Sequence, residues 1–226
     1  MTDIVGLRGV VFDFDGVILE SLDIKARAFV ALFSEWPEHE KEIVRLHLDN
    51  AGVSRFDKFA WIYRDILRKP LPDGGLERLG DEFSQLVLDE IMRCEFVRGA
   101  PELLERLAGH YELFVASATP EEEIREIVRG RGLDRFFAAV YGSPATKTEI
   151  LRRIVDERGL SPAELLFVGD ALSDYQGARS VGLAFVGRMP AAGGVEFPAE
   201  GVVATVADLA ELDARWAEIV SVAAPR

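Results

Sequence analysis

The sequence predicts an α/β protein with a doubly wound parallel sheet and an inserted helical domain. Three observations lead to this fold class. Short apolar runs rich in Val and Phe are bounded by Gly, Asp or Ser, as expected for buried strands. Helical patterns alternate with these runs from about residue 97 onward, which is typical of parallel strands joined by crossover helices. Between the first run and the second, about 75 residues have a helical pattern throughout.

The strands of the main sheet are predicted from five apolar runs. The helix expected at 120–130 begins with Pro120 and carries three Glu residues in its first turn, which are helix-start signals. The helix expected at 147–158 ends before Gly159, a helix-stop signal. Strands are expected at residues 10–14, 113–116, 138–141, 165–168 and 183–186.

The long insertion after the first strand is predicted to be a cap of helices. Apolar residues at spacings of three and four predict helices at 22–33, 37–48, 54–67 and 76–92. We therefore expect a Rossmann-like core of residues 1–20 and 97–226, and a helical domain of residues 21–96, called the cap below. Ligands of open α/β sheets bind beyond the carboxyl ends of the strands, so the cap would lie over the binding site.

Charge and composition exclude several classes of function. The chain has 26 Lys and Arg against 39 Asp and Glu, a net charge of −13, whereas nucleic-acid-binding surfaces need clustered basic residues. No stretch approaches 18 apolar residues and the N-terminus lacks a signal-peptide pattern, so no membrane association is expected. The single Cys94 excludes an intramolecular disulfide. We expect a cytoplasmic protein, monomeric or homodimeric.

Four aspartates are expected to meet at one edge of the sheet. Asp13 and Asp15 lie at the end of the first strand, where carboxylates at i and i+2 would point to the same side. Asp170 and Asp174 follow the fourth strand. Together they could bind a hard cation such as Mg²⁺, which prefers oxygen ligands. Each pair alone could equally be a turn or a helix cap, and the three His residues have no metal-type spacing.

Two further strand ends carry groups that could bind phosphate. Ser117 and Ala118 follow the second strand and precede a helix, whose N-terminal amides can bind an anion. Lys147 begins the helix after the third strand. The alternative for the hydroxyl is an ordinary helix N-cap, and the alternative for the lysine is a solvated side chain.

Taken together and in order, these residues resemble the four motifs of the haloacid dehalogenase-like hydrolases. The resemblance covers roughly residues 10–186, and the place of the cap is similar to that of the helical C1 cap in β-phosphoglucomutases and phosphoglycolate phosphatases. The motif residues are Asp13-Phe14-Asp15-Gly16-Val17, then Ser117, Lys147, and Gly169-Asp170 with Asp174.

This resemblance implies Mg²⁺-dependent phosphoryl transfer. Asp13 would be the nucleophile and Asp15 the general acid and base. Asp13, Asp170 and the backbone carbonyl of Asp15 would bind Mg²⁺, with Asp174 a direct ligand or a partner of a metal-bound water. Ser117, Ala118 and Lys147 would bind the phosphoryl group. Asp15 also argues against the dehalogenase and phosphonatase branches of the family, which have no Asp at this position.

The choice between phosphatase and phosphomutase depends on two cap residues. Gly52-Val53-Ser54-Arg55 is similar to the GVSR segment of β-phosphoglucomutases, so Arg55 could bind a remote part of the substrate or be a surface residue. Lys25 replaces the cap-hinge His of those mutases, and residues 145–149 depart from their lysine motif. Lys25 could reach the substrate or face solvent.

We therefore predict a phosphatase that acts on a small phosphorylated metabolite such as a sugar phosphate. A β-phosphoglucomutase-like phosphomutase is the alternative within the same family. From a different class, a phospho-accepting or catalytically silent binding module remains open.

Overall fold

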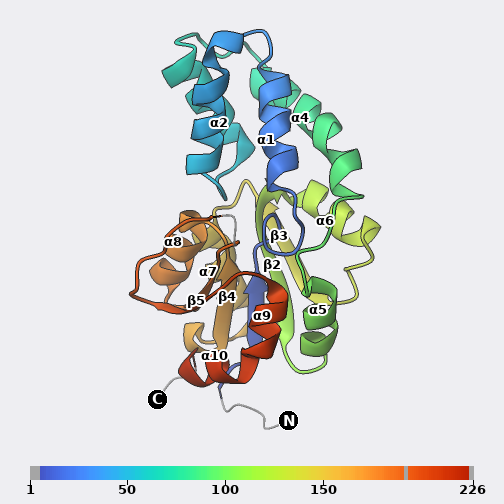
Figure 1. Ribbon diagram of the computed structural model, residues 1–226, viewed down its shortest axis with the longest axis vertical. Coiled ribbons are helices and arrows are strands. Elements are labelled where there is room, and N and C mark those ends of the chain that lie inside the picture. The colour runs from blue at the N-terminus through green and yellow to red at the C-terminus, as the bar shows by residue number, and fades with distance from the viewer. Residues whose placement is uncertain (1–5, 191–192, 224–226) are drawn as a thin grey trace.

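The computed structural model describes residues 6–190 and 193–223 and contains one parallel sheet. The strands lie in the order β3-β2-β1-β4-β5-β6, so the order reverses between β1 and β4 (Figure 1). All five strand pairs are parallel, which confirms the predicted fold class. The strands are β1 (Gly9–Phe12), β2 (Glu112–Pro120), β3 (Phe137–Ser143), β4 (Leu165–Gly169), β5 (Ala184–Arg188) and β6 (Val202–Val206).

Helices cover both faces of the sheet because side chains alternate along each strand. In β1, Val10 and Phe12 join the larger apolar cluster, while Val11 joins the cluster on the opposite face. The larger cluster includes residues of α5 (Ala100–Ala108), α6 (Glu121–Gly130), α9 (Leu209–Ala214) and α10 (Trp216–Ala223). The opposite cluster includes residues of α7 (Lys147–Arg158) and α8 (Leu172–Val181).

The observed strands extend one or two residues beyond several predicted ends, and three larger differences affect the site or the topology. The first strand ends at Phe12, so Asp13 and Asp15 lie in the turn that follows it and not in the strand. The second strand continues to Pro120, with a register shift after Ala116 that leaves the intervening residues outside the ladder. The sixth strand, β6, was not predicted, because its half-exposed edge position weakens the apolar pattern of a buried strand.

Four α-helices form the cap, and they lie together at one end of the molecule (Figure 1). Phe29, Phe59 and Phe83 come from three of these helices and pack with ring centroids 4.9 to 6.0 Å apart. The helix predicted at 54–67 is α-helical only over Arg55–Trp61, and residues Ile62–Ile66 form a π-helical turn that continues it. The cap helices are α1 (Leu22–Leu32), α2 (Glu40–Asp49), α3 (Arg55–Trp61) and α4 (Gly75–Ile91).

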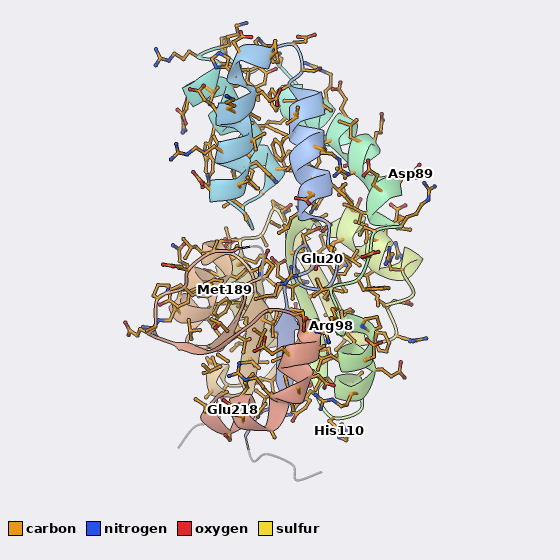
Figure 2. The ribbon with its side chains drawn as sticks, in the orientation of Figure 1. Glu20, Asp89, Arg98, His110, Met189 and Glu218 are labelled. Carbon is orange, nitrogen blue, oxygen red and sulfur yellow. The ribbon has the colours of Figure 1, made fainter. Side chains whose placement is uncertain are left out.

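The two connections between cap and sheet run side by side. The amide of Val97 donates to the carbonyl of Ile18 at 2.9 Å, and the amide of Glu20 donates to the carbonyl of Glu95 at 3.0 Å. Glu20 lies at the level where the cap meets the sheet (Figure 2). This paired crossing leaves the cap attached directly beside the turn that holds Asp13 and Asp15.

Among the described residues, no helix is both long and apolar enough to cross a membrane.

The return from the cap into the core depends on close contact between α5 and α9. Gly99, the N-cap of α5, has a φ of +81°, and a Cβ there would lie 2.4 Å from the backbone nitrogen of Ala210. That nitrogen donates to the carbonyl of Arg98, whose side chain pairs with Asp208 (Figure 2 labels Arg98). A side chain at Gly99 would therefore be strained and would also push the two helices apart.

We expect Gly99→Ala to lower the free energy of unfolding by about 2–4 kcal/mol, from left-handed backbone strain plus overpacking. Gly159→Ala is the matched control, because Gly159 also has a positive φ (+60°) but open space around it. The control should cost only about 1–2 kcal/mol. Urea unfolding of both variants measures the difference, and equal losses would show that the contact with α9 is not tight.

Candidate active site

A cavity of about 280 Å³ lies where the cap meets the carboxyl ends of the strands. Acidic residues come from the sheet side and basic residues from the cap. The cavity therefore combines groups that could bind a cation with groups that could bind an anion. Its charged lining residues are Asp13, Asp15 and Asp170 from the sheet side, and Lys25, Arg55 and Lys58 from the cap.

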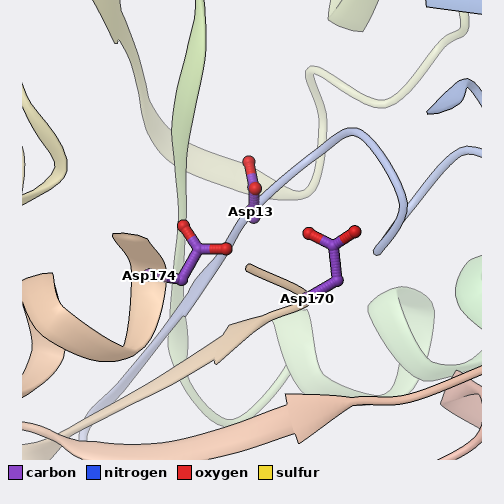
Figure 3. A group of neighbouring side chains, drawn as sticks. All are labelled: Asp13, Asp170 and Asp174. Atoms are coloured by element: carbon purple, nitrogen blue, oxygen red, sulfur yellow. The ribbon is translucent and has the colours of Figure 1, made fainter. Parts of the chain in front are cut away.

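Three carboxylates gather where β1 and β4 end (Figure 3). One oxygen from each of Asp13, Asp170 and Asp174 lies within 4.8 Å of the others. Burial, followed by repulsion from Asp174, raises the pKa of Asp13 above its ordinary value, although Lys147 opposes this. Burial and repulsion from Asp13 raise the pKa of Asp170 well above its ordinary value. Three mutually repelling carboxylates, of which Asp13 and Asp174 are buried and Asp170 is half-buried, fit a hard divalent cation such as Mg²⁺.

Lys147 is the buried partner of this cluster. Its Nζ lies 2.7 Å from Asp13 Oδ1 and 2.9 Å from Asp174 Oδ1, and it donates to the carbonyl of Ala116 at 2.6 Å. Burial disfavours the lysine charge, but the two carboxylates outweigh burial and raise the pKa of Lys147. The contact with Asp174 is an ion pair without hydrogen-bond geometry, so Asp174 Oδ1 keeps an unsatisfied acceptor. That oxygen is free to accept from a metal ligand or a bound water.

Residues 145–149, which depart from the lysine motif of the β-phosphoglucomutases, contain the N-terminal capping residues of α7. The hydroxyl of Thr146 accepts from the amide of Glu149, and the Glu149 carboxylate accepts from the amide of Thr146. This capping box starts α7 directly at Lys147. It thereby directs the lysine toward the ends of the neighbouring strands.

The Asp15 carboxylate is held by three side chains and is not part of the acidic cluster. Lys25 Nζ lies 2.5 Å from Asp15 Oδ2, Thr119 donates to the same oxygen at 3.0 Å, and Ser21 donates to Oδ1 at 2.6 Å. Burial acts to raise the pKa of Asp15, but Lys25 and these hydrogen bonds lower it. Lys25 therefore does not face solvent: it crosses from the cap to Asp15. A contribution of the Asp15 backbone carbonyl to metal binding stays a prediction.

The predicted phosphate-binding residues lie beside Lys147. Ser117 is fully buried, and its hydroxyl accepts from the amide of Thr119 at 3.1 Å, which leaves its own O–H free to donate. Ser117, Ala118 and Lys147 line a second cavity of about 220 Å³, and Ala118 also lines the main cavity. Lys147 lies 2.7 Å from Asp13, so this second cavity adjoins a carboxylate that lines the main one.

Arg55 connects the cap to the core. Its guanidinium forms a two-pronged ion pair with Glu123 of α6, with contacts of 2.5 and 3.0 Å, and donates to Ser84 at 2.9 Å. The guanidinium also lies 4.6 Å from the centroid of the Phe83 ring. Arg55 lines the cavity, as expected for a substrate contact, but its charge is already balanced by Glu123.

Several residues of the site were missed by sequence reasoning. Arg188 at the end of β5 is buried, donates to the carbonyl of Gly16 at 3.0 Å and pairs with Glu20. Gly16 has a φ of +74°, and a Cβ there would lie 2.2 Å from Asp170 Oδ2. Arg188 thus supports the turn that carries Asp15. An arginine that ends an apolar strand was the one signal available for Arg188. The other cavity residues that were missed are His47 and Lys58.

Comparison with known proteins yields one family and a set of relatives. The family model described as haloacid dehalogenase-like hydrolase matches residues 10–188. The chain is 27% identical over 184 residues to a phosphoglycolate phosphatase of Synechococcus elongatus, covering 78% of this chain and 81% of that protein. It is 40% identical over 95 residues to a 5′-nucleotidase of Pseudomonas aeruginosa, covering 39% of this chain and 43% of that protein.

Solved structures share the fold. A predicted phosphoglycolate phosphatase from Haemophilus somnus superimposes with a TM-score of 0.73 at 22% identity, covering 96% of this chain and 99% of that one. CbbY from Rhodobacter sphaeroides, in complex with phosphate, superimposes with a TM-score of 0.71 at 18% identity, covering 91% and 96%. Because the family match spans most of the sequence and includes all the predicted motif residues, the chain belongs to the haloacid dehalogenase-like hydrolases.

Proposed function

We propose that this protein is a Mg²⁺-dependent phosphatase that hydrolyses a small phosphorylated metabolite through an aspartyl-phosphate. The observation that carries the proposal is the shared cavity, in which Asp15 and the acidic cluster around Asp13 face three basic side chains of the cap, Lys25, Arg55 and Lys58. Membership of a hydrolase family and relatives that are phosphatases support the reaction class.

Asp13 is the proposed nucleophile. Its Oδ1 accepts from the amide of Phe14 at 2.6 Å and lies 2.7 Å from Lys147 Nζ. These contacts fix the carboxylate and leave Oδ2 to attack phosphorus. The attack splits one difficult displacement into two easier steps, formation and hydrolysis of the aspartyl-phosphate.

Asp15 is the proposed general acid and base. It would give a proton to the leaving oxygen and later take one from the water that attacks the intermediate. An anionic substrate next to Asp15 opposes the effect of Lys25 and favours the protonated form. Ser21 and Thr119 hold the carboxylate in place through both steps.

The remaining groups bind the phosphoryl oxygens and the ion. Ser117, Ala118 and Lys147 would donate to the oxygens whose charge develops in transfer. Mg²⁺ held by Asp13, Asp170 and Asp174 would offset the repulsion between the nucleophile and the anionic substrate. The cap would exclude water, and a cavity of about 280 Å³ suits a metabolite and not a phosphoprotein.

The phosphomutase alternative has no separate support. Arg55, the candidate for binding a second phosphate in a mutase, already pairs with Glu123. Lys25, which replaces the hinge His, pairs with Asp15. The proposal therefore remains a phosphatase.

Asp13→Asn should lower kcat for phosphate release by about 10³-fold or more, because the amide cannot attack phosphorus. Asp156→Asn is the matched control, since Asp156 is exposed on α7 and does not line the cavity. Phosphate release from a panel of phosphorylated metabolites, with melting curves for both variants, makes the measurement. Near-normal turnover by folded Asp13→Asn would refute the nucleophile.

Asp170→Asn should weaken Mg²⁺ binding by at least about tenfold, because it removes one anionic oxygen from the cluster. Titration calorimetry of Mg²⁺ into the variant and the unchanged protein reports binding without any substrate. Unaltered affinity would show that the acidic cluster is not the metal site.

A further inference from the structure

Lys58 of α3 is a buried cation without an anionic partner. Its side chain is 4% exposed, and in the described part of the chain no carboxylate oxygen lies within 4.0 Å of its Nζ. Its polar neighbours are the Nδ1 and the carbonyl oxygen of His47, at 3.3 and 3.4 Å. The two other basic residues that line the main cavity, Lys25 and Arg55, pair with carboxylates. Lys58 is therefore the basic residue whose charge the cavity leaves unbalanced.

The surroundings of Lys58 disfavour its charge. Burial, then repulsion from Lys25, lowers the pKa of Lys58 to about 7, with Arg55 adding to the effect and Asp15 opposing it. Burial and Lys58 itself lower the pKa of His47 to about 3, so His47 is a neutral acceptor. The ammonium has three N–H donors and two neutral acceptors. A buried charge held in this way destabilises the fold unless something else compensates it.

The position of Lys58 allows a ligand in the cavity to pair with its charge. Lys58 lines the same cavity as Asp13 and Asp170, and it does so from the cap side. Phe29 and Phe83 form part of the wall, and Lys58 Nζ lies 5.8 Å from the centroid of the Phe29 ring. A substrate whose phosphate is next to Asp13 would extend from the sheet toward Lys58.

We propose that Lys58 binds an anionic group, a carboxylate or a second phosphate, at the end of the substrate remote from the transferred phosphate. This inference rests on the proposed phosphatase function and narrows its substrate class to compounds with two separate anionic groups. The second anion supplies the missing counter-charge and an acceptor for the third N–H. Lys58 then contributes specificity, since a neutral analogue would leave its charge unpaired.

The test compares matched substrates with and without the second anion. The pairs are 2-phosphoglycolate against 2-hydroxyethyl phosphate, and glucose 1,6-bisphosphate against glucose 1-phosphate. In one of the two pairs, the unchanged protein should show a kcat/KM at least about tenfold higher for the compound that carries the second anionic group. Lys58→Met should reduce that preference to near unity. Lys41→Met, an exposed change of the same kind on α2, should keep the preference.

The outcomes distinguish a carboxylate from a phosphate as the second anion, and failure of the Lys58 inference from failure of the proposed phosphatase function. A preference in the phosphoglycolate pair assigns a carboxylate, and a preference in the bisphosphate pair assigns a phosphate. Turnover of both members with no preference, or with a preference that Lys58→Met leaves intact, overturns the role of Lys58 alone. Absence of Mg²⁺-dependent release from every substrate overturns the phosphatase and this inference together.

A pH profile of the unchanged protein provides a test that needs no variant. Lys58 is charged below its pKa, so the preference should be highest below about pH 7 and should fall as the pH rises through that value. The phosphoglycolate pair serves this test, because its remote carboxylate stays ionised over the range and ionisation of the transferred phosphate is common to both members and cancels in the ratio. The bisphosphate pair does not serve it, because its second phosphate itself titrates at about pH 6. Among the groups that face Lys58, Lys25 and Arg55 are paired with carboxylates, Asp15 is ionised and His47 is neutral. A preference independent of pH would contradict the role of Lys58.

A stability measurement distinguishes substrate binding from a structural role. Removing an uncompensated buried charge should leave the melting temperature of Lys58→Met unchanged or raise it. A marked fall would show instead that Lys58 holds the cap together, and would overturn the inference.

Discussion

The crowding of carboxylates at the ends of β1 and β4 is the constraint on which the rest of the site depends. Asp13 and Asp174 are buried and Asp170 is half-buried, so water screens their mutual repulsion poorly and the surrounding chain must supply opposite charge and room. Lys147, directed inward by the capping box that starts α7, supplies the charge. Gly16 leaves space for the Asp170 carboxylate, because a side chain at this position would clash with it. Packing alone would favour apolar residues here, which is why the cluster indicates a function.

The cap and the core meet through opposite charges. Lys25 and Arg55 on the cap pair with Asp15 and Glu123 on the core, and all of these residues except Glu123 line the cavity. Opening the cap would break these pairs and expose their charges to water, where they lose little because water solvates them well. If the cap opens to admit the substrate of the proposed reaction, closing it again would assemble the site at a small net cost. Lys58 differs because closure leaves it without a partner, and so it is available to a ligand.

The sequence predicted features that depend on residues close together in the chain, such as strands and short motifs. It predicted less well the features that depend on contacts between residues far apart in the chain. The parallel sheet and the family follow from apolar runs and from short motifs, and the strand order and the family match bear them out, while the roles of the strand-end residues stay predictions. The sequence left Lys25 open between substrate and solvent, because its ion pair with Asp15 depends on how the cap lies over the sheet, and the hydroxyl of Thr119, to which it also donates, is 94 residues away. Arg188 reaches Gly16 across 172 residues, and no local pattern reports such a contact. β6 was missed because an edge strand is only half buried.

The most direct test of the account is whether phosphate becomes attached to Asp13. In Asp15→Asn the base that activates water is lost, while 4-nitrophenyl phosphate has a leaving group that needs little help from an acid. Mixing the two with Mg²⁺ should release about one equivalent of 4-nitrophenol in a burst and then nearly stop. Mass spectrometry should find the phosphate on the peptide that contains Asp13. Steady release without a burst, or phosphate on another residue, would contradict the account.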